Sequence, residues 1–186
     1  MSWKRIIYAD DDTESVKKLV RLRLPSILVG LFLGVVLAVV FSTFEDVLAK
    51  DIRIAFFVPF VVYIAAAVGS QTQSIFSRDL RSRKAKFKNY LLKEAGVGII
   101  LGSISGILSG IAAYIWFQDS MLAMVVGISM FIAVAIAPHT ALIVTKLVQM
   151  EHLDPAVGAG PIATVIQDTL SVLIYGITAS IILLSS

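Results

Sequence analysis

The last apolar segment of this sequence contains one carboxylate, Asp168, among hydroxyl side chains. Its polar residues follow one another at spacings of four, three, four and three positions: Thr164, Asp168, Ser171, Tyr175 and Thr178. On a helix these spacings place the side chains along one face, and the other faces here carry Ile, Val and Leu. Because carboxylate and hydroxyl oxygens are the ligands that hard cations prefer, the pattern indicates a cation site centred on Asp168.

The same face continues towards the N-terminus through Pro161 and Val157. Proline has no backbone N–H, so Pro161 cannot donate to the carbonyl of Val157. We therefore expect this carbonyl oxygen to be free to face a cavity and to extend the polar path beyond Asp168.

Two other apolar segments supply companion residues for this path. In the stretch VGSQTQS, residues 68–74, Gln71 shares a helix face with Ser74. His139 stands next to Pro138 in a later segment, and two roles are open for it: a hydrogen bond between helices or a place in the cation path. The expected lining comprises Val157, Pro161, Thr164, Ser171, Gln71, Ser74 and His139.

A carboxylate in this position is costly. Of the 13 acidic residues, Asp168 alone lies deep within an apolar segment. An Asp near the centre of a bilayer costs at least about 2.5–3.5 kcal/mol, so an ionisable group kept there is a functional-site hypothesis by default. The alternative is that Asp168 is a structural centre of hydrogen bonds between helices.

The composition is that of an integral membrane protein. Hydrophobic residues make up 58% of the 186 positions and charged residues only 16%, which leaves several nearly uncharged runs of membrane-spanning length. There is no cysteine and there are two histidines, which excludes thiolate sites and argues against an imidazole-rich zinc site. The formal charge of +3 comes from basic residues near the apolar runs, so it indicates topology and not nucleic-acid binding.

We predict an all-α fold with five spans, at residues 25–43, 54–77, 91–117, 120–147 and 155–184. Residues 1–24 form a tail, and residues 25–186 form one transmembrane domain. The second, fourth and fifth spans contain or begin with prolines, which predict breaks in the helices: Pro59, Pro138, and Pro155 with Pro161.

Lys and Arg residues predict the orientation. They concentrate in the tail and in the loop between the second and third spans, whereas the first loop carries only Lys50 and Arg53 and the loop between the third and fourth spans carries none. The positive-inside rule therefore places the N-terminus in the cytoplasm and the C-terminus outside a plasma or inner membrane. Within the stretch DDDTESVKKLVRLR, residues 10–23 of the tail, acidic residues precede basic ones, as suits the dipole of a short helix lying on the inner membrane surface.

Glycines predict close helix packing. They recur every fourth residue in the third span, at Gly98, Gly102, Gly106 and Gly110, and Gly30 and Gly34 repeat the pattern in the first span. Small residues at this spacing let helix backbones approach closely in lipid.

The stretch LDPAVGAGPIATVIQD, residues 153–168, resembles the signature of the MgtE family of magnesium transporters. Shorter matches are RLP at 23–25, FE at 44–45 and FVPF at 57–60, and the family's GGNxGxQ pattern is here AAAVGSQ, residues 65–71, with Ala67 in place of Asn. The resemblance extends from Arg23 over nearly the whole chain.

This resemblance implies five spans per subunit and a homodimer, with a cation pore at the interface lined by the second and fifth spans. It also implies that Asp168 is the principal Mg²⁺ site in the pore. Family members usually carry a cytoplasmic domain and paired CBS domains that sense magnesium; residues 1–24 would occupy the place of the helix that connects these domains to the pore.

The expected function is therefore transport of Mg²⁺, or of other divalent cations, across the lipid bilayer. The alternative is an exchanger that couples the divalent cation to Na⁺ or H⁺. An intramembrane enzyme with Asp168 and His139 as an acid–base pair lacks a nucleophile motif, and a purely structural subunit leaves the polar face of the last span unexplained. We therefore expect no enzymatic activity.

Overall fold

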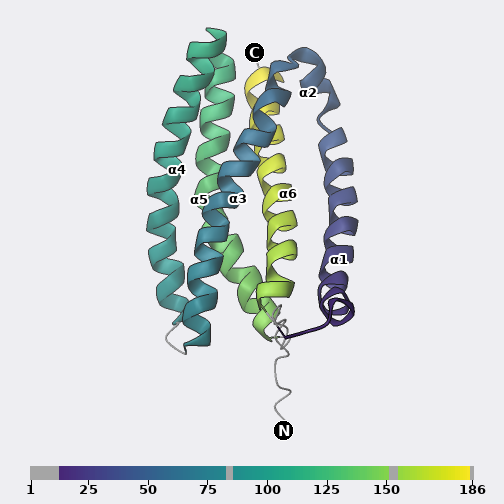
Figure 1. Ribbon diagram of the computed structural model, residues 1–186. Helices are drawn as coiled ribbons and strands as arrows, with labels where there is room; N and C mark the ends of the chain where they lie inside the picture. Colours follow the sequence, from purple (N-terminus) through teal and green to yellow (C-terminus); the bar gives the residue numbers. More distant parts are fainter. Residues whose placement is uncertain (1–12, 83–85, 151–154, 185–186) are drawn as a thin grey trace.

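The computed structural model describes residues 13–82, 86–150 and 155–184, and these form a bundle of long helices with no strand (Figure 1). The elements in chain order are α1 Val16–Ser42, α2 Glu45–Lys50, α3 Arg53–Arg81, α4 Phe87–Phe117, α5 Ser120–Met150 and α6 Pro155–Leu184. Among the described residues, the five long helices are each long and apolar enough to cross a membrane. The predicted all-α membrane fold is confirmed.

The two ends of the bundle differ. The start of α1, the end of α3 and the start of α4 lie together at the lower end in Figure 1, which we term the basic end because Lys17, Arg21, Arg78 and Lys88 are found there. The short helix α2 and the end of α6 lie at the opposite end, which we term the α2 end.

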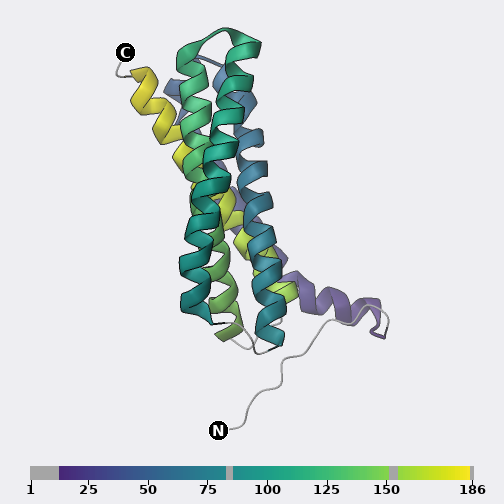
Figure 2. The same cartoon turned by 90° about the vertical axis from the view of Figure 1, so that its left-hand side faces the viewer.

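Helix α1 begins at Val16, inside the predicted tail, and is capped by Ser15, whose hydroxyl accepts a hydrogen bond from the N–H of Lys18 at 3.4 Å. It packs against α6 and is otherwise largely exposed. Figure 2 shows its first turns projecting sideways from the foot of the bundle. This direction agrees with a segment that lies along a membrane surface, and the helix then continues through Pro25.

Helices α4 and α5 pack through the predicted glycine row. Gly98, Gly102 and Gly106 are buried, and a Cβ added at Gly98 would lie 2.5 Å from the carbonyl oxygen of Ala135 on α5. The two backbones are therefore in direct contact. The first span differs, because a Cβ at Gly34 would meet no described atom within 4 Å. Gly34 thus makes no close helix contact within the subunit.

The prolines of α3 and α5 do not interrupt these helices, so the predicted breaks at Pro59 and Pro138 are wrong. Pro138 cannot donate to the carbonyl of Val134, but Val134 is fully buried, so the unpaired carbonyl lies within the protein and not in lipid. The remaining helical hydrogen bonds carry the chain past the proline. Figure 1 shows α5 changing direction in its lower half.

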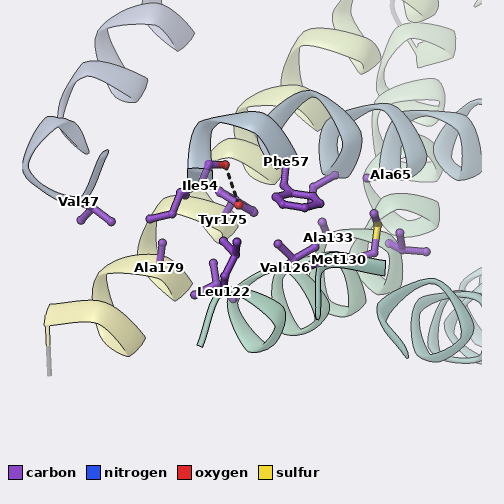
Figure 3. Packing of buried hydrophobic residues seen from close by; sticks show 14 of the residues in the cluster. Val47, Ile54, Phe57, Ala65, Leu122, Val126, Met130, Ala133, Tyr175 and Ala179 are labelled. Atoms are coloured by element: carbon purple, nitrogen blue, oxygen red, sulfur yellow. Dashed lines mark hydrogen bonds between the residues drawn. The ribbon is translucent and has the colours of Figure 1, made fainter. Parts of the chain in front are cut away.

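The apolar core lies towards the α2 end. It joins residues of α2, α3, α4, α5 and α6, among them Val47, Phe57, Met130 and Tyr175 (Figure 3). The hydroxyl of Tyr175 donates to the carbonyl of Ile54 at 2.8 Å. Towards the basic end a second, smaller cluster among the described residues includes Val144 of α5 and Ala163 of α6, and the ring of Phe76 packs against those of Phe87 and Tyr90.

An ion network joins two connections at the α2 end. The guanidinium of Arg53 donates to Asp51 at 2.7 Å and to Asp119, in the α4–α5 connection, at 2.7 Å. The bond from Arg53 holds the pKa of the Asp51 carboxyl below its usual range. The carboxylate of Asp119 caps α5 by accepting a hydrogen bond from the N–H of Leu122, and this bond lowers its pKa. The hydrogen bond from Arg53 lowers it further.

Replacing Arg53 with Gln is expected to lower the melting temperature of the purified protein at neutral pH. Carboxylates with lowered pKa values stabilise the fold above the pKa of the unfolded chain, and this contribution is lost as the pH falls through the folded pKa. The difference in melting temperature between Arg53→Gln and the unchanged protein should therefore become smaller below about pH 4. Thermal unfolding in detergent at both pH values measures it. Arg78→Gln, which breaks a highly exposed pair with Asp79, is the control and should change little.

Candidate cation-binding site

Asp168 lies in α6, the helix that contacts α1, α3 and α5 (Figure 1). Its side chain is partly exposed, yet its Oδ1 atom is buried and has no hydrogen-bond partner among the described residues. A structural centre of hydrogen bonds would pair both oxygens with neighbouring helices. The described part of the chain provides no such partner, so a buried acceptor is left available to a ligand.

Exposed polar residues lie on α6 one turn before Asp168 and on the neighbouring helix α3. Ser70, Gln71 and Ser74 are exposed on α3, and Thr164 is exposed on α6. Ser70 and Thr164 border the same small cavity, so the polar surfaces of the two helices lie side by side. We term Ser70, Gln71, Ser74, Thr164 and Asp168 the polar face.

The polar face is unusual for a surface within membrane-spanning helices, where most exposed residues are apolar. An amide or hydroxyl in contact with acyl chains loses its hydrogen bonds to water, which is unfavourable. The polar face therefore indicates a surface that is covered by protein or wetted by water in the membrane.

The sequence pattern along α6 does not form one continuous exposed stripe. Thr164 and Asp168 reach the surface of the subunit, whereas Ser171, Tyr175 and Thr178 are buried. Ser171 donates to the carbonyl of Gln167 at 2.9 Å and is fully enclosed. The reason is the change of neighbours along the helix: at the α2 end α6 is covered by α2 and by the start of α3.

The other predicted lining residues lie at different depths. His139 is half-buried on α5, and its ring has no hydrogen-bond partner among the described residues, so no bond to a neighbouring helix is seen there. Val157 and Pro161 belong to α6, but their side chains lie outside the described part of the chain, as do Leu153 and Asp154 at the start of the signature stretch. Their roles stay predictions.

Sequence reasoning passed over Gln167. This residue precedes Asp168 and is nearly fully buried, and its Oε1 atom also has no partner among the described residues. The sequence does contain a signal for Gln167, because it is a second polar residue directly beside Asp168 in an apolar segment. Adjacent residues lie on different faces of a helix, so Gln167 faces the interior while Asp168 faces outward.

One subunit offers a single charged ligand at this site. Among the described residues, no three His, Asp or Glu side chains gather closely enough to hold a metal ion. The chemistry available is one carboxylate with hydroxyl and amide groups nearby. Such a set suits a cation that keeps most of its own water molecules, as Mg²⁺ commonly does in proteins.

Comparison with known proteins gives a family match over most of the chain. The profile of the MgtE family, described as divalent cation transporters, matches residues 58–178. The matched region includes most of α3, all of α4 and α5, and α6 from its start through Thr178.

Three curated relatives are magnesium transporters named MgtE. The protein of Bacillus subtilis is 30% identical over 156 residues, which are 82% of this chain and 35% of the relative. That of Enterococcus faecalis is 28% identical over 89% of this chain and 37% of its own length. That of Thermus thermophilus is 30% identical over 81% of this chain and 34% of its own length. The chain thus spans about a third of the length of these relatives.

Proposed function

Since the chain belongs to the MgtE family of divalent cation transporters, we propose that it transports Mg²⁺ across the membrane through a pore in which Asp168 is the principal cation-binding residue. The observation that carries this proposal is the environment of Asp168: a buried carboxylate oxygen that has no partner among the described residues, on a helix that packs against α3 and shares with it an exposed polar surface within otherwise apolar helices. The pore is formed by two copies of the chain, whose polar faces meet.

A two-fold arrangement accounts for both features. It removes the polar face from lipid, and it brings two Asp168 side chains towards one axis. Helices α3 and α6 line the pore, with Gln71, Ser74 and Thr164 beside the carboxylates. Two negative charges then balance one divalent ion.

The pore holds a largely hydrated ion. Mg²⁺ loses its water ligands reluctantly, and carboxylate and carbonyl oxygens can accept hydrogen bonds from its hydration shell. Conduction requires binding that admits the ion and also releases it, which a pair of carboxylates acting through water satisfies better than a full protein cage. With the basic end in the cytoplasm, an inside-negative potential draws the cation inward by about 2.3 kcal/mol per charge for each 100 mV.

Flux into proteoliposomes tests the proposed activity. The purified chain is reconstituted with a Mg²⁺-sensitive dye inside the vesicles, and external Mg²⁺ is added under an inside-negative potential. We expect dye signal well above that of protein-free vesicles. A signal equal to that of protein-free vesicles argues against transport by this chain. The comparisons give no support for coupling to Na⁺ or H⁺, and flux that is independent of both gradients is the expected result.

Cysteine cross-linking tests the proposed pairing of polar faces. The chain has no cysteine, so each substitution creates a single thiol. We expect Gln71→Cys or Ser74→Cys to form a disulfide-linked dimer on mild oxidation in membranes, because the proposed pairing brings the two copies of α3 together. A disulfide needs Cα atoms roughly 4.4–6.8 Å apart.

The matched control is Ile107→Cys, a residue 63% exposed on α4. It should remain monomeric under the same oxidation. If Ile107→Cys forms dimers and neither Gln71→Cys nor Ser74→Cys does, the subunits do not pair through their polar faces.

A further inference from the structure

A small cavity lies behind the polar face, between α3, α5 and α6. Its volume is about 20 Å³. Its polar lining consists of Ser70, Gln73, Thr164 and Gln167, and Gly69 and Ala141 are among the small residues that complete the wall. Because Ser70 and Thr164 are exposed whereas Gln167 is buried, the cavity leads inward from the polar face.

Gln167 presents an unsatisfied group in this region. Its side chain is 4% exposed, and its Nε2 donates to the hydroxyl of Ser171 at 3.3 Å. Its Oε1 has no partner among the described residues. A buried amide oxygen without a donor carries its full desolvation penalty, so native proteins almost always supply one from protein or from an ordered water.

We infer that this cavity binds one ordered water molecule, which donates a hydrogen bond to Oε1 of Gln167 and bridges α6 to Gln73 on α3. A site for one water needs roughly 10–15 Å³ and two to four polar partners. The cavity exceeds this volume, and the residues that line it include Gln73 and Gln167, whose amides can donate and accept. No charged residue lines the cavity, so a cation placed in it would lose its hydration without a balancing charge.

The bridge makes Gln167 a positioning residue for Asp168, which follows it on the same turn of α6. The apolar core and the hydrogen bond from Tyr175 to Ile54 already hold α6 towards the α2 end. The bridge at Gln167 adds a second fixed point next to Asp168, which holds the carboxylate towards the polar face. This second step rests on the proposed function of Asp168, whereas the presence of the water does not.

A double-mutant cycle on thermal unfolding tests the water bridge. The variants are Gln167→Met, Gln73→Met and the pair, each keeping side-chain length while removing the polar atoms. We expect each single change to lower the melting temperature and the pair to lower it by less than the sum, because the second change removes a partner that the first has already left unpaired.

The control cycle pairs Gln167→Met with Thr72→Val. Thr72 is on another face of α3, where it donates to Glu94 at 2.8 Å, so its effect should add to that of Gln167→Met. Additivity in the Gln73 cycle, or a higher melting temperature for Gln167→Met alone, would overturn the bridge. A cation in the cavity would also overturn the bridge. In that case Na⁺, but not choline, would raise the melting temperature of the unchanged protein, and Gln167→Met would abolish this response.

Mg²⁺ uptake tests the positioning role separately. Gln167→Met is expected to raise the Mg²⁺ concentration for half-maximal uptake several-fold, because the carboxylate is no longer held in place. Thr72→Val should leave that concentration unchanged. An unchanged half-maximal concentration in Gln167→Met overturns the positioning role. A failure of the unchanged protein to transport Mg²⁺ would instead count against the proposed function, and the thermal cycle would still decide on the water.

Discussion

Asp168→Asn is expected to reduce Mg²⁺ uptake by at least about a hundredfold while leaving the assembled protein intact. The substitution keeps the size of the side chain and removes its charge. A carboxylate about 5 Å from a divalent ion has a gross attraction of roughly 6 kcal/mol at the effective dielectric constant of a protein. If desolvation offsets half of this, the remainder for one carboxylate corresponds to a factor of about a hundred in binding. Because the substitution removes both carboxylates of the proposed dimer, this factor is a minimum.

Dye-based uptake into proteoliposomes, at matched protein content, measures the loss. Size-exclusion chromatography in detergent checks that the variant assembles as the unchanged protein does. Asp119→Asn is the matched control: it removes a carboxylate from the connection at the α2 end and should retain uptake. Full uptake by Asp168→Asn would remove this residue from the cation path.

Gly98→Ala is expected to destabilise the bundle more than its single added methyl group suggests. The new Cβ would lie 2.5 Å from the carbonyl oxygen of Ala135 and 3.3 Å from its Cα, so the backbones of α4 and α5 must separate. Overpacking of this kind costs typically about 1–3 kcal/mol, which exceeds the roughly 1 kcal/mol that Ala gains over Gly in a helix.

Gly96 provides a control on the same helix. A Cβ at Gly96 would meet no described atom within 4 Å, so Gly96→Ala should leave the melting temperature unchanged or raise it. Scanning fluorimetry in detergent compares the two variants. Equal stability of Gly98→Ala and Gly96→Ala would show that the α4–α5 contact is looser than the structure has it.

Much of the fold is predictable from the sequence because lipid imposes simple rules. Apolar runs of sufficient length must be helices, since every backbone group must be paired internally. The glycine row from Gly98 to Gly106 repeats at the helical period, and the structure places it against α5. Gly34 shows the limit of this rule: the same spacing in α1 meets no helix within the subunit.

The prolines were misread for a physical reason. A proline removes one hydrogen bond and predicts a break, but the surrounding bundle decides whether the freed carbonyl is tolerated. In α5 the carbonyl belongs to the buried residue Val134, so the helix continues through Pro138. This compensation depends on neighbours in space and has no signal in the local sequence.

The candidate site was predictable in part. Polarity in an apolar segment identified Asp168, and the structure adds that its Oδ1 lacks a partner within the described residues. Spacing alone grouped Ser171 with Thr164, whereas the neighbours of α6 bury the former and expose the latter. The role of Gln167 depends on a cavity formed by three helices, which no single segment encodes.

The close approach of α4 and α5 bears on how the chain matures. Only Gln118 and Asp119 separate these helices, so their contacts are local and can form as soon as the hairpin has left the ribosome. Helix α6 is synthesised later and docks onto surfaces that α3 and α5 already present. Because Asp168 reaches the surface of the folded subunit, docking of α6 alone does not remove it from lipid, and the acid is withdrawn from acyl chains only when the second copy proposed above joins.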